Sequence, residues 1–188
     1  MSEAPRRRDL LTTVAFATAG VGALAALWPF IDSMNPAADV RARATVFRLN
    51  TLEGETPRII AVGNHPVMLF RRSLQVLSEL RASSNQPAKF RDIDSVRSRQ
   101  PAWAKNWHRS LRPELMVCIA NCTREGCVVS RMTWTSEPAE VIRCSCCGAT
   151  FDLAGRLFEG PAPSNLTVPN YRFIGDDTIE FNEMNLLS

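Results

Sequence analysis

The sequence predicts an all-β head carried on a single N-terminal transmembrane α-helix. One observation behind this prediction is an uncharged run of 22 residues at positions 10–31. A second is a series of short alternating or apolar runs bounded by turn residues, with one further stretch of helical spacing. A third is the length, because 188 residues suit one modest domain with an appendage and exclude two full catalytic domains.

The uncharged run is long enough to cross a membrane as a helix. At about 1.5 Å per residue it matches a hydrocarbon core of roughly 30 Å. Arg6, Arg7 and Arg8 precede the run, so the positive-inside rule predicts a cytoplasmic N-terminus and a head on the other side. A cleaved secretory signal is the alternative, but its apolar region would span only about 7–15 residues. The string RRRDLL also fits a twin-arginine export signal, so residues 1–33 are interpreted as signal-like N-terminus and anchor.

Residues 34–45 are predicted to form a tether, and residues 46–188 the head. Pro36 breaks the helix, and small residues dominate the tether. Strands are predicted at residues 45–49, 58–62, 66–70, 114–119, 140–143, 156–158, 171–174 and 178–181. A short helix is predicted at residues 72–82 and a long ordered loop at 83–112, while Arg71 and Arg72 are expected at a solvated strand end.

The charge distribution does not favour nucleic-acid binding. The 22 basic residues are nearly matched by 19 acidic ones, which leaves a net charge of +3. The basic residues are also spread along the chain instead of forming a basic stripe.

Six cysteines lie within 30 residues, whereas the whole chain has only two histidines. Such a cluster indicates one metal or redox site, because a disulfide-rich miniprotein would scatter its cysteines along its length. Five of them fall in two boxes, NCTREGC with Cys122 and Cys127, and RCSCCGATFD with Cys144, Cys146 and Cys147. Two loops that each present thiols predict an iron–sulfur or zinc site, since thiolate binds both firmly.

The two boxes resemble the cluster-binding loops of Rieske iron–sulfur subunits of cytochrome bc-type quinol–cytochrome c reductases, which read C-T-H-L-G-C and C-P-C-H-G-S. Counterparts in bacterial members also exist for RRRDLL, WPFIDSMNPAADVRA, GNHPVMLFRRS, KNWHRSLRPELMV and GPAPSNLTVPNYRFI. The resemblance therefore covers nearly the whole chain. It implies small antiparallel sheets, a rubredoxin-like cluster-binding subdomain at about residues 118–163, and a proline-rich loop at 160–171 that covers the cluster.

The resemblance also implies roles for single residues. Cys122 and Cys144 match the two cysteine ligands of the family's [2Fe–2S] cluster. Cys127 and Cys146 match the disulfide that ties the two loops together.

The two histidine-ligand positions of the family fall on Arg124 and Cys147. Arg124 cannot ligate a metal, because its guanidinium is always protonated. Ala149 and Phe151 stand where high-potential members have Ser and Tyr, whose hydroxyls hydrogen-bond to the cluster region. Replacing imidazole by thiolate and removing hydroxyl donors both lower a reduction potential.

Three kinds of site remain open at this stage. Cys147 is a possible replacement ligand and, with Cys122 and Cys144, gives three thiolates. A fourth thiolate could come from Cys118, or from the disulfide pair if it does not form; otherwise Cys118 is a small buried strand residue. The alternatives are a site without a cluster, an altered [2Fe–2S] cluster, or a zinc site.

The resemblance implies a subunit of a membrane quinol–cytochrome c reductase that transfers electrons from quinol toward cytochrome c. It further implies cytochrome b and cytochrome c-type partners, a dimeric complex, and a single-pass anchor in a bacterial inner membrane with a periplasmic head. In the family, one exposed histidine ligand accepts the proton of the quinol, and this chain lacks that histidine. A second hypothesis is therefore a cluster-free structural, assembly or regulatory subunit, and a third is a cysteine-ligated zinc module.

Overall fold

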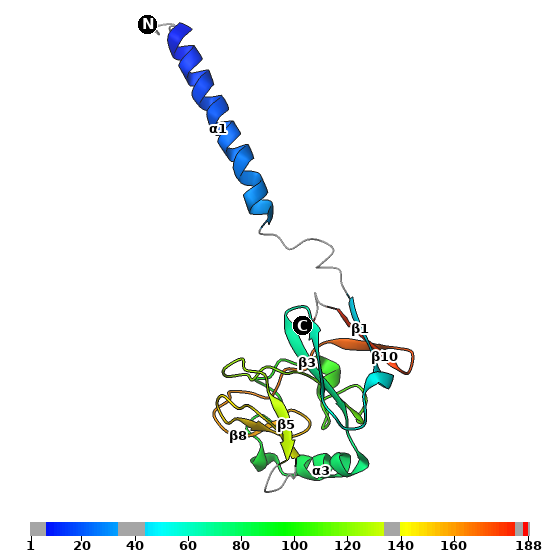
Figure 1. Cartoon of the computed structure of the whole chain (residues 1–188). Coiled ribbons are helices and arrows are strands. Elements are labelled where there is room, and N and C mark those ends of the chain that lie inside the picture. Colours follow the sequence, from blue (N-terminus) through cyan, green and yellow to red (C-terminus); the bar gives the residue numbers. More distant parts are fainter. Residues whose placement is uncertain (1–6, 34–43, 134–139, 183–185, 188) are drawn as a thin grey trace. The chain divides into compact units, whose positions relative to one another are not determined.

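The computed structural model describes residues 7–33, 44–133, 140–182 and 186–187 (Figure 1). The chain divides into two compact units, residues 1–41 and residues 42–188. Most of the predicted tether, together with Arg6 of the predicted export signal, lies outside the described residues.

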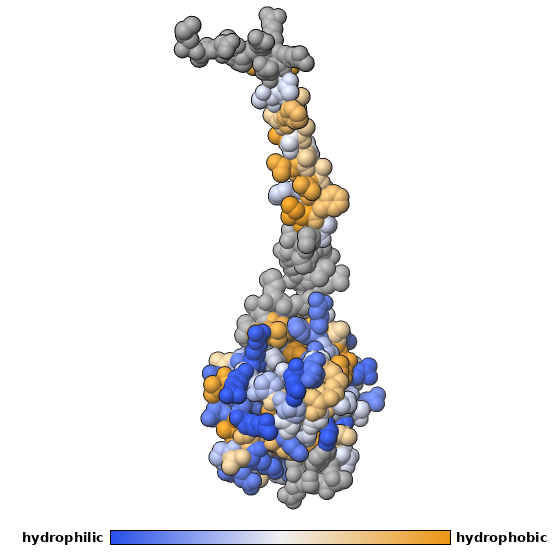
Figure 2. Space-filling view, turned by 90° about the vertical axis from the view of Figure 1, so that its left-hand side faces the viewer, coloured by the Kyte–Doolittle hydropathy of each residue, from blue (hydrophilic) through white to orange (hydrophobic). Residues whose placement is uncertain are grey.

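The first unit contains one long helix, α1 (Arg7–Ser33). Its segment Leu10–Ser33 is apolar enough to cross a membrane, and none of the tested window is buried inside the protein. At about 1.5 Å per residue, such a segment exceeds the roughly 30 Å of a hydrocarbon core. Figure 2 shows the apolar surface of this helix, which contrasts with the mainly hydrophilic surface of the head. The helix is a membrane anchor.

The described residues of the head form three small antiparallel sheets, as the resemblance implies. The first sheet has the order β1 (Ala44–Arg48), β10 (Thr178–Asn182), β9 (Tyr171–Ile174). The second has the order β2 (Arg58–Val62), β3 (His65–Arg71), β4 (Leu115–Ile119). The third has the order β5 (Ser130–Thr133), β6 (Glu140–Arg143), β7 (Thr150–Phe151), β8 (Leu157–Glu159).

The central β3–β4 ladder has a buried face on each side. Successive side chains of a strand point to opposite faces, and here each face packs on its own core. The pairs Met68↔Cys118 and Phe70↔Met116 belong to one core, and Val67↔Ile119 and Leu69↔Val117 belong to the other. We call the first the thiol-side core, because it also contains Cys122 and Cys144, and the second the terminal core, because β1, β9 and β10 pack on it.

One helix covers the thiol-side core. Helix α3 spans Leu74–Ser84, and Ser73 caps its N-terminus. The Ser73 hydroxyl accepts a hydrogen bond from the Val76 backbone N–H. Val76 and Leu80 enter the core, whereas Leu74 is exposed. Figure 1 shows α3 at the end of the head, near β5.

The long segment between α3 and β4 contains two short 3-10 helices, η2 (Pro87–Lys89) and η3 (Ala102–Ala104). Another 3-10 helix, η1 (Leu49–Thr51), follows β1. Buried side chains hold the segment between α3 and β4 against the head. Arg109 donates to the carbonyls of Ala154, Gly155 and Leu166 and is almost fully buried. The loop after β7 and the segment after β8 are thereby joined through one guanidinium.

The expectation of a solvated Arg72 is wrong. Its guanidinium is buried, donates to the carbonyls of Leu153 and Pro113, and contacts the Met116 sulfur. Burial lowers the Arg72 pKa to about 10. The chain thus uses this arginine as an internal donor for loop carbonyls that the sheets leave unpaired.

Candidate thiol site

The first cysteine loop, residues 121–128, is a tight turn that begins directly after β4. The Cys122 backbone N–H donates to the Cys127 carbonyl at 2.8 Å, and the Gly126 N–H donates back to the Cys122 carbonyl at 2.9 Å. Gly126 has a φ of +70°, a conformation that glycine adopts without steric cost. An isolated bridge between Asn121 and Val128 closes the loop.

The second cysteine loop, residues 144–149, repeats this pattern after β6. The Cys144 N–H donates to the Ala149 carbonyl at 2.9 Å, and the Gly148 N–H donates to the Cys144 carbonyl at 2.8 Å. Gly148 has a φ of +72°. Each loop therefore holds its first cysteine in the same backbone setting, with that side chain buried in the thiol-side core.

A disulfide joins the two loops. Cys127 and Cys146 are bonded to each other, 19 residues apart in sequence. The structure thus contains the pairing that the resemblance implies. Because a cross-link restricts the unfolded chain, this bond stabilises the docking of one loop on the other.

Three thiols meet between the loops, and we call Cys122, Cys144 and Cys147 the thiol cluster. Their sulfur atoms all lie within 4.8 Å of one another. The Sγ atoms of Cys122 and Cys147 are 3.6 Å apart. Cys122 and Cys144 are buried and Cys147 is half-buried. The site residues predicted from the two boxes are therefore brought together.

The thiols of the cluster differ in their protonation. Burial raises the pKa of Cys122 to about 11, although the backbone N–H groups of Arg124 and Glu125 act in the opposite direction. Burial also acts to raise the pKa of Cys144, but hydrogen bonds from the Cys147 backbone and from the Cys122 thiol outweigh it, and the net shift is downward. Cys144 therefore loses its proton at a lower pH than Cys122.

The proline-rich segment, residues 160–171, lies against both loops, and we call it the cover loop. The Thr123 hydroxyl donates to the Ser164 carbonyl at 2.8 Å. At the other loop, a Cβ added to Gly160 would lie 2.5 Å from the Ala149 Cα, so only glycine fits there. The cover loop is anchored at Asn165, whose side chain bonds the Leu157 N–H and the Asp92 carbonyl.

The side chains of the remaining sequence candidates are not part of the thiol cluster. The Arg124 guanidinium is half-exposed and forms an ion pair with Glu125 at 2.9 Å. Cys118 is buried in β4, where burial raises its pKa to about 12. His65 begins β3, and the His108 ring contacts the Ser110 hydroxyl and Trp107. Among the described residues, neither histidine nor Cys118 belongs to a group that could hold a metal.

Sequence reasoning missed several residues that position the loops. Thr123 and Gly160 link the cover loop to the two cysteine loops. Only the glycine at the start of a proline-rich run gave a signal for such a contact. Arg109 gave none, because a basic residue in a polar stretch is usually solvated.

A family profile and the curated relatives name the same subunit. A family profile described as the TAT signal of the ubiquinol–cytochrome c reductase Fe–S subunit matches residues 1–37. The Allochromatium vinosum protein named ubiquinol–cytochrome c reductase iron–sulfur subunit is 36% identical over 94% of this chain and 88% of its own. The Rickettsia felis protein of the same name is 35% identical over 92% of this chain and 91% of its own.

This chain belongs to the family of ubiquinol–cytochrome c reductase iron–sulfur subunits. It is thus a Rieske-type protein, as the cysteine boxes predict. A solved structure described as a hyperthermophilic respiratory Complex III is similar over 89% of this chain and 98% of that chain, with 16% identity and a TM-score of 0.49.

The donor set of this family member does not fit a histidine-ligated cluster. By the resemblance of the two boxes, Cys122 and Cys144 match the family's cysteine ligands, and the family's two imidazole positions fall on Arg124 and Cys147. The Arg124 side chain is a cation paired with Glu125, and the Cys147 thiol lies within hydrogen-bonding distance of Cys122. Ala149 and Phe151, which the resemblance places at the family's hydroxyl positions, are buried and have no side-chain hydrogen-bond donor.

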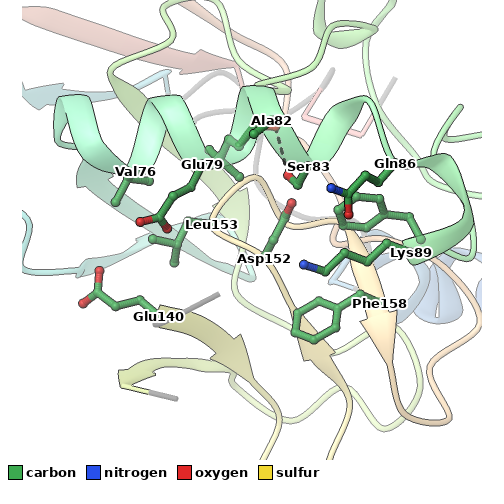
Figure 3. Close-up of a pocket in the computed structure, with 12 residues that line it drawn as sticks. Val76, Glu79, Ala82, Ser83, Gln86, Lys89, Glu140, Asp152, Leu153 and Phe158 are labelled. Carbon is green, nitrogen blue, oxygen red and sulfur yellow. Dashed lines mark hydrogen bonds between the residues drawn. The ribbon is translucent and has the colours of Figure 1, made fainter. Parts of the chain in front are cut away.

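A separate pocket lies between α3 and the strands β6 and β8 (Figure 3). It has a volume of about 280 Å³. Its lining mixes Glu79, Glu140 and Lys89 with the Phe158 ring, and it contains no cysteine. The buried Asp152 carboxylate in its wall is committed to the Arg156 guanidinium, so it offers no free acid or base. The thiol cluster, not this pocket, is the site that the sequence predicts.

Proposed function

We propose that this chain occupies the position of the iron–sulfur subunit in a bc-type quinol–cytochrome c reductase, with its head in the periplasm. The observation that carries the proposal is the complete two-loop framework with its disulfide and cover loop. Relatives named for this subunit match more than nine-tenths of the chain. Cytochrome b and cytochrome c-type subunits are the partners that this position implies, in a dimeric complex.

The family's reaction has two parts, electron transfer and acceptance of the quinol proton, and the residues of this chain affect the two parts differently. Electron transfer from quinol toward cytochrome c is the role that family membership implies. In the family an imidazole at the site accepts the quinol proton, and the matching side chains here are Arg124 and Cys147. An arginine that stays protonated cannot accept that proton. We therefore expect binding to the partner subunits to be retained and histidine-dependent quinol oxidation to be absent.

A second candidate function is a structural, assembly or regulatory role in such a complex. The observation that favours it is the Arg124–Glu125 ion pair, which fills a ligand position with a surface salt bridge. In that role the head would contribute docking surfaces and no electron carrier.

The two functions differ in one experiment. The full chain, tagged at its C-terminus, is purified from its native membranes in mild detergent. We expect haem b and haem c proteins to co-purify, and their absence would contradict the placement in a bc-type complex. Quinol–cytochrome c reductase activity of the purified complex then separates the candidates, because only an electron-carrying subunit supports turnover.

A further inference from the structure

We propose that Cys122, Cys144 and Cys147 bind a single zinc ion as a mononuclear three-thiolate site with one open coordination position. The proposal concerns the chain by itself and does not depend on its placement in a complex. It replaces the two-iron centre of the family by a one-metal centre built from the same two loops.

The number of donors favours one metal ion. A [2Fe–2S] cluster bound only by cysteine takes four thiolates, and the thiol cluster supplies three. Cys127 and Cys146 are bonded to each other, and Cys118 points into the thiol-side core from β4. Three protein ligands with a fourth open position are a common arrangement for zinc.

The spacing of the sulfur atoms favours the same reading. With Zn–S bonds near 2.3 Å, tetrahedral geometry places two sulfur ligands about 3.8 Å apart. The Sγ atoms of Cys122 and Cys147 are 3.6 Å apart, and all three sulfurs lie within 4.8 Å of one another. The Cys147 sulfur thus lies close enough to the Cys122 and Cys144 sulfurs for one ion to contact all three.

The backbone around the sulfurs suits bound thiolate. The N–H groups of Arg124 and Glu125 donate to Cys122, and those of Cys146 and Cys147 donate to Cys144. Such hydrogen bonds orient the sulfur lone pairs and stabilise their negative charge. Each tight turn therefore presents its first cysteine ready for a metal, and the thiol protons leave to solvent on binding.

The choice of ion follows from charge and ligand preference. Soft thiolate sites select Zn²⁺, Cu⁺ or iron–sulfur clusters. Three thiolates carry a net charge of about −1 with a divalent ion and about −2 with a monovalent one. Because two of the three cysteines are buried, the smaller residual charge costs less desolvation energy, which favours Zn²⁺.

The test uses the full chain, purified anaerobically in detergent without chelator. We expect about one zinc per chain and no inorganic sulfide by elemental analysis. After exchange with Co²⁺, sulfur-to-cobalt charge-transfer bands and tetrahedral d–d bands should appear. Cys144→Ser should lose both the zinc and the cobalt bands, whereas the control Cys118→Ala should keep them, because Cys118 lies outside the thiol cluster.

A second variant guards against a folding defect in the buried Cys144. Cys147→Ser changes the half-buried thiol and should lower zinc affinity at least tenfold while the circular dichroism of the head stays unchanged. Three results would overturn the proposal: iron with acid-labile sulfide, unchanged zinc in both cysteine variants, or a second disulfide between Cys122 and Cys147. Each is independent of whether haem proteins co-purify.

Discussion

Cys147 adds a third thiol, half-buried, to the two buried cysteines that begin the loops. A thiol is shorter than an imidazole, so its donor atom lies nearer the backbone of its loop. In this head the Cys147 sulfur approaches Cys122 across the gap between the loops. The two disulfide-linked loops thus present three thiols whose sulfur atoms lie within 4.8 Å of one another.

Restoring the family's donors is the first prediction. In the double variant Arg124→His with Cys147→His, two imidazoles join Cys122 and Cys144 on an unchanged framework. We expect reconstitution with iron and sulfide to give a reduced-state EPR spectrum with nitrogen couplings, since imidazole would ligate one iron. The single variant Arg124→His is the control. It supplies only one imidazole, so it should not give the spectrum of a cluster with two nitrogen ligands. A double variant that stays without a cluster would mean that the loops themselves no longer accept two irons.

His108 gives a prediction about acid stability. Burial, with a smaller effect of Arg72, lowers its pKa from 6.5 to about 4. The imidazole is therefore neutral in the folded head at pH values where the unfolded chain already binds a proton. The contribution of the neutral His108 to the free energy of unfolding is complete above pH 6.5 and is lost as the pH falls toward about 4. His108→Gln should flatten the fall in melting temperature over this interval, and an unchanged pH profile would contradict the assignment.

At the site, the sequence indicates which cysteines lie together but not how they are arranged. The spacing within each box brings Cys122, Cys144 and Cys147 onto two tight turns, which local sequence signals can indicate. The 3.6 Å approach of Cys122 to Cys147 depends on how the two loops dock. That docking is a tertiary property of the disulfide and the cover loop, so no local pattern predicts it.

Among the elements, the cover loop depends on one glycine. Gly160 has a φ of +96°, and an added Cβ would meet the Ala149 backbone. The loop can therefore lie against the second cysteine loop only because position 160 has no side chain. This contact limits how far the cover loop can be redesigned.

Gly160→Ala is accordingly expected to destabilise the head by about 2 kcal/mol or more, from both backbone strain and the clash. Gly175→Ala is a matched control, because Gly175 has a φ of +67° but nothing within 4 Å of an added Cβ. It should cost only about 1 kcal/mol. Urea unfolding of the two variants measures the difference, and equal losses would show that the clash with Ala149 relaxes at no cost.

The elements themselves were predicted well where the pattern is local. The predicted strands 58–62, 140–143 and 171–174 match β2, β6 and β9, and the predicted helix at 72–82 matches α3 with a shift of two residues. The short strands β5 and β7 were missed, because β7 has only two residues and β5 has an exposed, polar pattern. These strands form through their neighbours in the third sheet and not through their own sequence.

The whole chain consists of a membrane helix and a head with its own cores. Both hydrophobic cores are formed within the head, between residues 49 and 186. The described residues of the membrane helix are exposed. The head should therefore fold without the helix.

A chain that begins at Ala42 should accordingly be soluble without detergent. Its circular dichroism should show the β-sheet content of the head, and its Cys127–Cys146 disulfide should form under oxidising conditions. We expect the melting temperature to lie within a few degrees of that of the head in the full chain. Aggregation of the shortened chain with loss of its β signal would show that the head needs its anchor to fold.

The double-faced β3–β4 ladder has a consequence for cooperativity. Because each strand supplies alternate side chains to the two cores, we expect the two cores to melt together. The head should unfold in one calorimetric transition despite having two cores. A ligand bound at the cysteine loops would then also raise the melting temperature of the sheet formed by β1, β10 and β9, which packs on the terminal core. The thermal midpoint of β1, a strand of the sheet that packs on the other core, thus becomes a remote reporter of occupancy at the thiol cluster.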